Sequence, residues 1–431
     1  MKTIMTLAST LATGSLLAAT PVITENSVTM TQDASTRTVT ITYTLEDAPA
    51  IVTLDIQTNG VSIGCQHFQN LGGDVNMKVQ PDTHTITWQP DVDWGCGPQR
   101  MTVKDVKAVV KAWACDAPPP YAVFDLVVPN TVRFYSCEEA VPGGVNENPR
   151  YKEDLLVMRR IPAANVTWRM GSNSTEPIDG KSASDYANEF KNAEIPHYVM
   201  LTKDYYMGVF EVTQKQISHF PPTTAVPSAP SKAGDHHPIE QYGWNHIRGN
   251  GVSWPGDEHN LGAGCPLEAL RNLTGVTFDL PTEAQWEFAC RAGTGTGLNS
   301  GKECDTTDYA NANEVAYHYY NTHSSADGHQ NVGEKLKNAW GLYDMHGNIG
   351  EFCLDWHASG DDYVASFGAD YKSGDVVVDP KGPTTGNNRT VRGGSYSNGS
   401  RYCRSAARGT TGSGSSRRPY VGFRLCCPAE F

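Results

Sequence analysis

The sequence contains none of the short patterns that identify the commonest classes of enzyme and metal-binding protein. It has 11 cysteines but no CxxC pair and no Cys/His finger spacing, so a structural zinc site is not expected. It also has no phosphate-binding glycine loop, no dinucleotide-binding fingerprint and no recognisable Ser/His/Asp set. These absences argue against nucleotide-dependent enzymes and the common serine hydrolases.

Positive charge and long apolar runs are also scarce. The formal net charge is −13, with 34 Lys and Arg against 47 Asp and Glu, so the chain lacks the cations that neutralise nucleic-acid phosphates or an anionic membrane. Beyond the N-terminus no run approaches the roughly 20 apolar residues that span a bilayer. We therefore expect neither nucleic acid nor a membrane as a partner of the mature chain.

The first 20 residues have the pattern of an export signal. Lys2 precedes a run of apolar and small residues that ends at Ala18 and Ala19, and polar residues follow it. We therefore predict a signal peptide at residues 1–20 and a mature protein that is secreted or periplasmic.

Export would place the cysteines in an oxidising compartment, where they can form disulfides. Cys65 with Cys96, and Cys115 with Cys137, are the candidate bridges in the first third of the chain. Because the total is odd, at least one cysteine is left over.

A chain of 431 residues is long enough for two domains, and its pattern changes near residue 150. Residues 25–130 hold six or seven short runs of alternating apolar and polar residues, separated by Asp, Gly, Asn and Pro turns. This pattern predicts an immunoglobulin-like or fibronectin-like β-sandwich, acting as a spacer or adhesion module. Residues 131–150 are the predicted linker, and residues 151–428 the second domain.

Two helix starts are predicted in the second domain. Thr213 is the expected N-cap of a helix in QKQISHF. Pro281, Thr282 and Glu283 form the expected first turn of a helix in EAQWEFACRAG.

Turn-forming residues, oxygen ligands and aromatic residues are densest at residues 338–356, NAWGLYDMHGNIGEFCLDW. Three glycines allow sharp turns, while Asp344, Asn348 and Glu351 offer side-chain oxygens at spacings of four and three. Calcium takes six to eight oxygen ligands, so a calcium site is one interpretation, although the spacing is not that of an EF-hand. The other interpretation is a packed core turn whose polar groups cap the backbone.

A second group of metal-binding residue types is formed by His236, His237, Glu240 and His246. Two histidines and a carboxylate can hold non-haem iron. Pro238 interrupts the run and no helix would set the ligands on one face, so ordinary loop histidines are the alternative.

Seven segments of the second domain occur in a recognisable order: RIPAANVTWRMGS, YYMGVFEVTQKQ, FDLPTEAQWEFACRAGT, NAWGLYDMHGNIGEF, VRGGSYSN, CRSAARG and VGFRL. Together they resemble the formylglycine-generating enzyme family, also called the sulfatase-modifying factor family, over about residues 151–428. The resemblance implies an α+β domain akin to the C-type lectin fold, often with structural calcium. By that resemblance the calcium ligands would be the side chains of Asp344 and Glu351 and the carbonyls of Gly347 and Ile349.

The family's oxidase chemistry has a requirement that this sequence does not meet. Members oxidise a substrate cysteine with dioxygen through two cysteines that bind Cu(I), a soft ion that prefers two thiolates. Asn398 stands at the first of these positions, the loop is about three residues shorter, and Cys403 is the only cysteine nearby. One thiolate cannot form the bis-thiolate site, so copper is not expected.

Ser395, Asn398, Cys403 and Arg408 are the candidate pocket residues, because they lie where relatives have the oxidase centre. Hydroxyl, amide and guanidinium groups suit recognition of a peptide or glycan. For Cys403 the two interpretations are a disulfide, with Cys353 as the first candidate partner, and a reactive thiol beside arginines.

Three functions are therefore open from the sequence. The first is an exported member of the family without oxidase activity, which binds a protein, peptide or glycan. The second is a different metal-dependent oxidative chemistry, as in relatives that tailor a siderophore chromophore. The third is formylglycine generation on sulfatases, with Cys403 acting beside Cys353 or Cys426. The missing cysteine pair favours the first, and whether the chain is an enzyme is left open.

Overall fold

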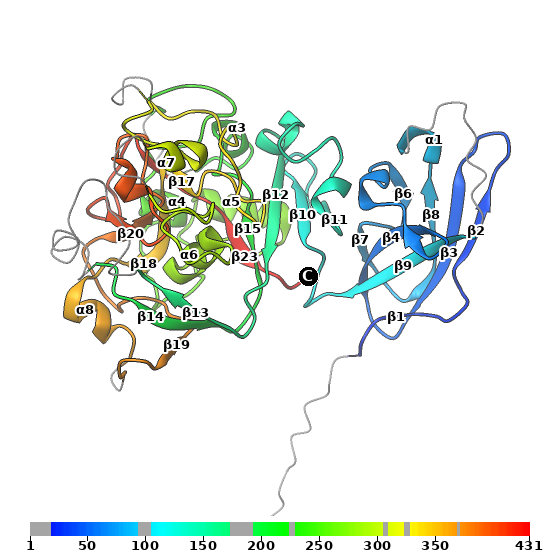
Figure 1. Cartoon of the computed structure of the whole chain (residues 1–431), viewed down its shortest axis with the longest axis horizontal. Coiled ribbons are helices and arrows are strands. Elements are labelled where there is room, and N and C mark those ends of the chain that lie inside the picture. Colours follow the sequence, from blue (N-terminus) through cyan, green and yellow to red (C-terminus); the bar gives the residue numbers. More distant parts are fainter. Residues whose placement is uncertain are drawn as a thin grey trace, which may run out of the picture.

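The computed structural model describes residues 19–93, 105–172, 193–223, 229–304, 309–322, 328–368 and 371–431. The predicted signal peptide, apart from its last two residues, and Cys96 lie outside the described residues. The chain forms two units side by side, a small β-rich one near the N-terminus and a larger mixed one (Figure 1). The predicted α+β class, rich in strands and with short helices, is confirmed.

The N-terminal unit is a sandwich of two antiparallel sheets. One sheet contains β1 (Val22–Ile23), β2 (Thr29–Gln32), β3 (Val39–Glu46), β6 (Leu71–Gly73) and β8 (Asp82–Trp88). The other contains β4 (Ala50–Thr58), β5 (Val61–Ser62), β7 (Met77–Val79) and β9 (Val106–Ala114). One hydrophobic core lies between the sheets and includes Tyr43 and Leu54. Every second residue of β3 is buried up to Leu45, as expected for a strand with one face on a core.

A five-stranded antiparallel sheet connects the two units, and it begins earlier than the sequence predicts. Its strands, in spatial order, are β11 (Val132–Tyr135), β10 (Tyr121–Asp125), β12 (Leu155–Ile161), β15 (Tyr205–Gly208) and β23 (Cys426–Pro428). We assigned residues 121–135 to the sandwich and the linker, but β10 pairs with β12 along its whole length. The connection after the sandwich is therefore only the short segment between β9 and β10.

The remaining strands of the second unit form small sheets. They are β13 (Val166–Met170), β14 (His197–Leu201), β16 (Ala316–Tyr317), β17 (His346–Gly347), β18 (Gly350–Trp356), β19 (Val376–Val378), β20 (Arg389–Arg392), β21 (Arg408–Thr410) and β22 (Val421–Gly422). The sheet that positions the candidate site has the order β21-β20-β18-β22.

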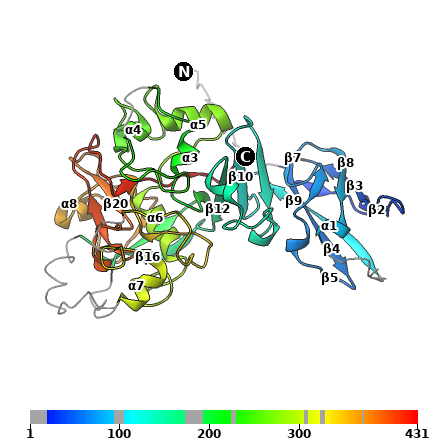
Figure 2. The ribbon, with the colours of Figure 1, turned by 90° about the horizontal axis from the view of Figure 1, so that it is seen from above.

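The helices are short and lie around these sheets (Figure 2). They are α1 (Pro90–Asp93), α3 (Gln214–Ile217), α4 (Trp244–Arg248), α5 (Pro266–Thr274), α6 (Glu283–Arg291), α7 (Ala310–Val315) and α8 (Gly360–Ala365), with 3₁₀ turns η1 (Cys65–His67), η2 (Glu138–Ala140), η3 (Pro149–Lys152) and η4 (Ser400–Cys403). Thr213 caps α3 as predicted. The start of α6 differs from the prediction, because Thr282 is its N-cap and accepts a hydrogen bond from the Gln285 N–H, which places Pro281 before the helix. Within the described ranges no helix is both long and apolar enough to cross a membrane.

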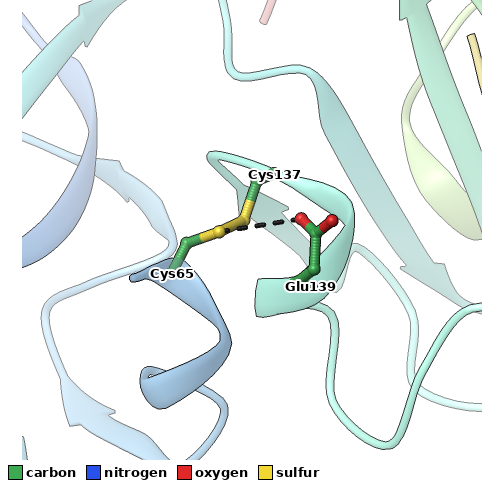
Figure 3. Close-up of side chains that lie close together, drawn as sticks. All are labelled: Cys65, Cys137 and Glu139. Carbon is green, nitrogen blue, oxygen red and sulfur yellow. Dashed lines mark hydrogen bonds between the residues drawn. A yellow bond between two sulfur atoms is a disulfide. The ribbon is translucent and has the colours of Figure 1, made fainter. Parts of the chain in front are cut away.

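A disulfide between Cys65 and Cys137 joins the sandwich to the second unit (Figure 3). Both predicted pairings of these cysteines, with Cys96 and with Cys115, are therefore wrong. The physical reason is that β11 belongs to the connecting sheet, which brings η2 against η1 instead of back into the sandwich. The Phe134 N–H donates to the Asn76 carbonyl across the same junction at 2.8 Å.

Candidate functional site

The segment from the end of β20 through η4 to the start of β21 carries the four residues that the sequence predicts to line a pocket. It begins at Gly393 and Gly394, which have positive φ values of 88° and 68°. A Cβ on Gly394 would lie 2.8 Å from the Cys403 sulfur, so only glycine lets the start of the loop pack against η4.

Ser395 and Asn398 form a closed turn. The Ser395 hydroxyl donates to Asn398 Oδ1 at 2.7 Å, and the Asn398 N–H donates to the Ser395 carbonyl at 2.9 Å. Ser395 is only 1% exposed, so its hydroxyl supports the turn and does not face an open pocket. Asn398 is half-buried, and its carbonyl accepts from the Tyr319 N–H at 2.8 Å.

Cys403 is fully buried beneath this turn. It packs in a small cluster with Leu298, Cys304, Ala312, Val315 and Ala316. Burial, and next the neighbouring Cys304, raise the pKa of the Cys403 thiol, so it is protonated at neutral pH. Neither interpretation of Cys403 is supported, because a buried protonated thiol is not reactive and the sulfur bonds to no other cysteine that the structure describes.

Cys353, the predicted partner, lies in β18 within a different core cluster. It is also buried and forms no disulfide, and burial raises its pKa. The predicted Cys353–Cys403 bridge is therefore wrong, because the two sulfurs pack in separate clusters.

A Cys–His pair that the sequence did not reveal lies close by. Cys290 Sγ is 3.9 Å from His346 Nε2, and His346 Nδ1 donates to the Cys403 carbonyl at 2.5 Å. The Asn299 N–H donates to Nε2, so the imidazole is held in one neutral tautomer. Burial raises the pKa of Cys290 to about 12 and lowers that of His346 to about 4, so neither group ionises near neutrality. This pair supports the loop and cannot supply a nucleophile.

Arg408 is engaged by a buried carboxylate. Its Nε donates to Glu283 Oε1 at 2.5 Å and its Nη2 to Glu283 Oε2 at 2.8 Å, and its guanidinium lies over the Tyr363 ring at 3.9 Å. Burial alone would raise the pKa of Glu283, but Arg408 and then Arg392 hold it at about 2. Arg408 therefore fastens α6 to β21 and does not face a ligand.

Exposed aromatic residues stand beside Asn398, where the sequence did not predict them. We call Tyr309, Tyr319 and Tyr320 the tyrosine ridge. The rings of Tyr309 and Tyr320 are stacked, with centroids 4.3 Å apart, and Tyr319 meets Tyr320 edge-on at 5.4 Å. Tyr319 is 39% exposed and Tyr320 is 49% exposed. A Cβ on Gly399 would lie 3.4 Å from the Tyr320 ring, so the ridge adjoins the turn.

In the predicted calcium loop, one of the two carboxylates is occupied by protein donors. Arg424 Nη2 donates to Glu351 Oε1 at 2.7 Å, and Arg424 Nε lies 3.0 Å from both carboxylate oxygens. The Trp286 indole N–H donates to Glu351 Oε2 at 2.6 Å. Glu351 is thus charge-balanced and hydrogen-bonded without an ion, so it does not support the predicted ligand set.

Asp344, the other predicted carboxylate ligand, fits an ion better. Its Oδ2 accepts from the Gly333 N–H at 2.6 Å, while its Oδ1 is buried with no partner among the described residues. Burial raises the pKa of Asp344 to about 6. The nearby Glu211 is also buried, and burial and then Asp344 raise its pKa. Two carboxyl groups that resist ionisation together are what a divalent cation would stabilise, so calcium stays a prediction.

The structure brings together only two members of the predicted facial triad. His236 pairs with Glu153 at 2.8 Å, and His246 Nδ1 accepts from the Gly243 N–H. His237 and Glu240 do lie together, but the third member of their cluster is His329. Of the two interpretations, the structure does not support the facial triad, because His236 and His246 have other partners and His329, 92 residues from His237, contacts His237 and Glu240 instead.

One cavity and one group of metal-ligating residue types lie away from the four predicted pocket residues. A cavity of about 480 Å³ lies near β15, β23 and the start of α6, and none of the four predicted pocket residues lines it. In the part of the chain that the structure describes, one trio of metal-ligating residue types comes within ligand reach, namely Cys65, Cys137 and Glu139 (Figure 3). Its two sulfurs are bonded to each other, so it is not a metal site in the oxidised protein.

Comparison with known proteins agrees with the order of the motifs. Residues 167–428 match the family described as the sulfatase-modifying factor enzyme 1-like domain. The formylglycine-generating enzyme of Mus musculus is 26% identical over 331 residues, which cover 69% of this chain and 80% of that protein. The formylglycine-generating enzyme of Streptomyces coelicolor is 34% identical over 158 residues, which cover 35% of this chain and 47% of that protein.

Two solved structures are also similar to this chain. Treponema denticola variable protein 1 covers 64% of this chain and 95% of its own, with 24% identity and a TM-score of 0.42. PvdO from Pseudomonas aeruginosa covers 63% of this chain and 94% of its own, with 19% identity and a TM-score of 0.45. Because the family match alone covers more than half of the sequence, the chain belongs to the formylglycine-generating enzyme, or sulfatase-modifying factor, family.

Proposed function

We propose that this protein is an exported member of the family that binds a protein, peptide or glycan and does not oxidise cysteine. The observation that carries the proposal is the state of the segment in which relatives would bind copper. Asn398 stands at the first copper-binding position, and the nearby Cys403 is fully buried and protonated. An amide and a buried thiol are a poor ligand set for Cu(I).

We place the binding surface on Asn398 and the tyrosine ridge. Tyrosine offers a large, rigid contact area with a polar tip, and it loses little conformational entropy on binding. Tyr320 already stacks on Tyr309, so its ring is held in place before a ligand arrives. Aromatic side chains held in place beside an amide that can form hydrogen bonds suit the binding of a ligand better than the oxidation of a cysteine.

Calcium in the loop around Asp344, Gly347, Ile349 and Glu351 is part of this proposal as a structural ion. The partnerless Oδ1 of Asp344 supports it, while the pairing of Glu351 with Arg424 opposes the full ligand set. If bound, the ion would balance charge beneath the sheet that carries the loop after β20.

Formylglycine generation is the second candidate, and one observation favours it. Cys403 packs against Cys304, a thiol that we did not consider from the sequence, whereas Cys353 and Cys426 belong to another cluster. Both Cys304 and Cys403 are fully buried, so this pair would have to open before it could meet a substrate.

The experiment compares binding with oxidation in the same preparation. The full mature chain is applied to an array of immobilised glycans and to a library of peptides, and every hit is measured again with Tyr320→Ala. Tyr198→Ala is the matched control, because Tyr198 is 47% exposed on β14, away from the ridge. We expect at least a tenfold loss of affinity for the first variant and no loss for the second.

A parallel assay incubates the chain with Cu(I), dioxygen and a cysteine-containing sulfatase peptide. Conversion of that cysteine to an aldehyde, abolished in Cys403→Ser, would overturn the proposal in favour of the oxidase. Equal binding by Tyr320→Ala and the unmodified chain would overturn the assignment of the surface.

A further inference from the structure

A buried cluster of two histidines and a carboxylate lies outside the proposed binding surface. Its members are His237, Glu240 and His329, which we call the His–Glu cluster. Glu240 and His329 are fully buried, and His237 is 9% exposed. Buried ionisable groups are costly unless each polar atom is paired, so the partners of every atom in the cluster matter.

A hydrogen bond between the two histidines links their tautomers. The Nδ1 of His329 lies 3.1 Å from the Nδ1 of His237, so one ring donates and the other accepts. When His329 is the donor, a lone pair is left on its Nε2.

The lone pair of His329 faces a carboxylate. Its Nε2 lies 3.5 Å from Glu240 Oε1, which also accepts from the Ser231 N–H. Among the described residues, neither His329 Nε2 nor Glu240 Oε2 has a hydrogen-bond partner. A cation between these two buried groups would replace the hydrogen bonds that both atoms lack.

The separation fits a metal ion. Two ligand atoms at about 2.1 Å from one ion, with an angle near 110° between them, stand about 3.5 Å apart. One imidazole nitrogen and one carboxylate are ligands that suit borderline first-row divalent ions. The hydrogen bond from His329 Nδ1 to His237 is the kind of outer contact that orients a metal-bound histidine.

We propose that His329 Nε2 and the Glu240 carboxylate bind a divalent first-row transition-metal ion of the Zn²⁺ class, oriented by His237. Water would complete the coordination, because the protein supplies only two ligand residues. The ion would fasten the segment of Glu240 to the segment of His329, whose ring lies 6.1 Å from that of Tyr396 in the loop after β20. The ligand atoms of this site are not those of the predicted calcium loop, although the neighbouring Gln330 N–H donates to Asn348 of that loop at 2.9 Å.

The test measures metal binding directly and needs no ligand of the binding surface. The full mature chain is freed of metal with a chelator and titrated with Zn²⁺ by calorimetry. Co²⁺, whose visible absorption reports its coordination, is then bound and displaced with Zn²⁺. We expect one ion per chain, a tetrahedral-type Co²⁺ spectrum and a higher melting temperature with Zn²⁺.

The variants are Glu240→Gln and His329→Gln, and His236→Gln is the matched control. His236 is adjacent to the cluster in sequence but pairs with Glu153 at the surface. We expect the first two to lose at least tenfold in Zn²⁺ affinity and the control to keep it. His237→Ala should lose about tenfold through the orientation of His329.

Absence of stoichiometric uptake by the unmodified chain would overturn the proposal. Unchanged affinity in Glu240→Gln or His329→Gln would also overturn it. If both variants fail to fold, the Co²⁺ spectrum of the unmodified chain tests whether His329 is a ligand. A spectrum that shows no nitrogen ligand would exclude His329 and overturn the proposal.

Discussion

Cys65 and Cys137 form a covalent link between the N-terminal sandwich and the connecting sheet, across 72 residues of sequence. The link lies beside hydrogen bonds that cross the same junction, such as the one from Gln69 Nε2 to the Glu139 carbonyl at 3.0 Å. The sandwich is therefore held against the second unit, which suits a module that positions a binding surface.

The first prediction concerns this disulfide. Cys65→Ser should lower the free energy of unfolding by up to about 4 kcal/mol, because a closed loop of this length restricts the unfolded chain. Chemical denaturation under non-reducing conditions measures the loss. Cys115→Ser is the control, since Cys115 lies at the same junction without a disulfide and should change stability much less. Equal effects of the two substitutions would contradict the prediction.

The second prediction concerns the thiols of Cys353 and Cys403. Both are fully buried with raised pKa values, so iodoacetamide should not label them in the native protein. Cys115 is half-buried and should be labelled first. Peptide mapping by mass spectrometry gives the order of labelling. A peptide containing a Cys353–Cys403 disulfide, or native labelling of Cys403, would show that the packing of η4 is different.

The third prediction concerns the buried pair of Glu351 and Arg424. Arg424→Met should destabilise the protein by about 3–5 kcal/mol, because it leaves the Glu351 carboxylate buried without its counter-charge. Lys302→Met is the matched control, since Lys302 pairs with Glu314 at the exposed surface and such pairs contribute at most about 1 kcal/mol. Urea denaturation compares the two. Full recovery of the stability of Arg424→Met on addition of calcium would show that a cation can take the place of the guanidinium at Glu351.

The fourth prediction concerns Asp344, whose pKa burial raises to about 6 from an ordinary value near 4. The folded protein then binds this proton more tightly than the unfolded chain does. The stability contributed by the proton is fully present below about pH 4 and is lost as the pH rises through about 6. Thermal melts in a chelator, from pH 4 to pH 7, should show this loss in the unmodified chain and less of it in Asp344→Asn.

The same thermal melts, with calcium in place of the chelator, test whether Asp344 binds the ion. If the ion binds Asp344, millimolar calcium should raise the melting temperature at pH 7 and should not do so in Asp344→Asn. Asp361→Asn serves as the control, because Asp361 is exposed in the first turn of α8. A calcium effect that survives in Asp344→Asn would place the ion elsewhere.

Local features of the sequence predicted local structure well. Thr213 was predicted as an N-cap and is one, because a hydroxyl followed three residues later by Gln satisfies the first free N–H groups of a helix, and this needs no distant partner. The alternation in β3 predicts a strand because one face of a sheet is buried. The ordered motifs predicted the family, because they extend over the whole second unit.

The pairing of cysteines and histidines could not be predicted in this way. Cys137 bonds to Cys65 because β11 joins the connecting sheet, and His329 meets His237 because two distant loops fold over one another. Nothing in the spacing along the chain encodes either contact.

By itself, the sequence determined the class of fold, the N-cap of α3 and the family, since each depends on residue types and their order along the chain. The interpretation of Asn398 as a replaced copper ligand stays a prediction from the family resemblance. Only the tertiary structure decided that Cys403 is buried, that Arg408 and Glu351 are already paired, and that Tyr319 and Tyr320 are exposed beside the turn. Burial and charge pairing depend on which segments meet in space, and these segments lie up to some 200 residues apart in the chain.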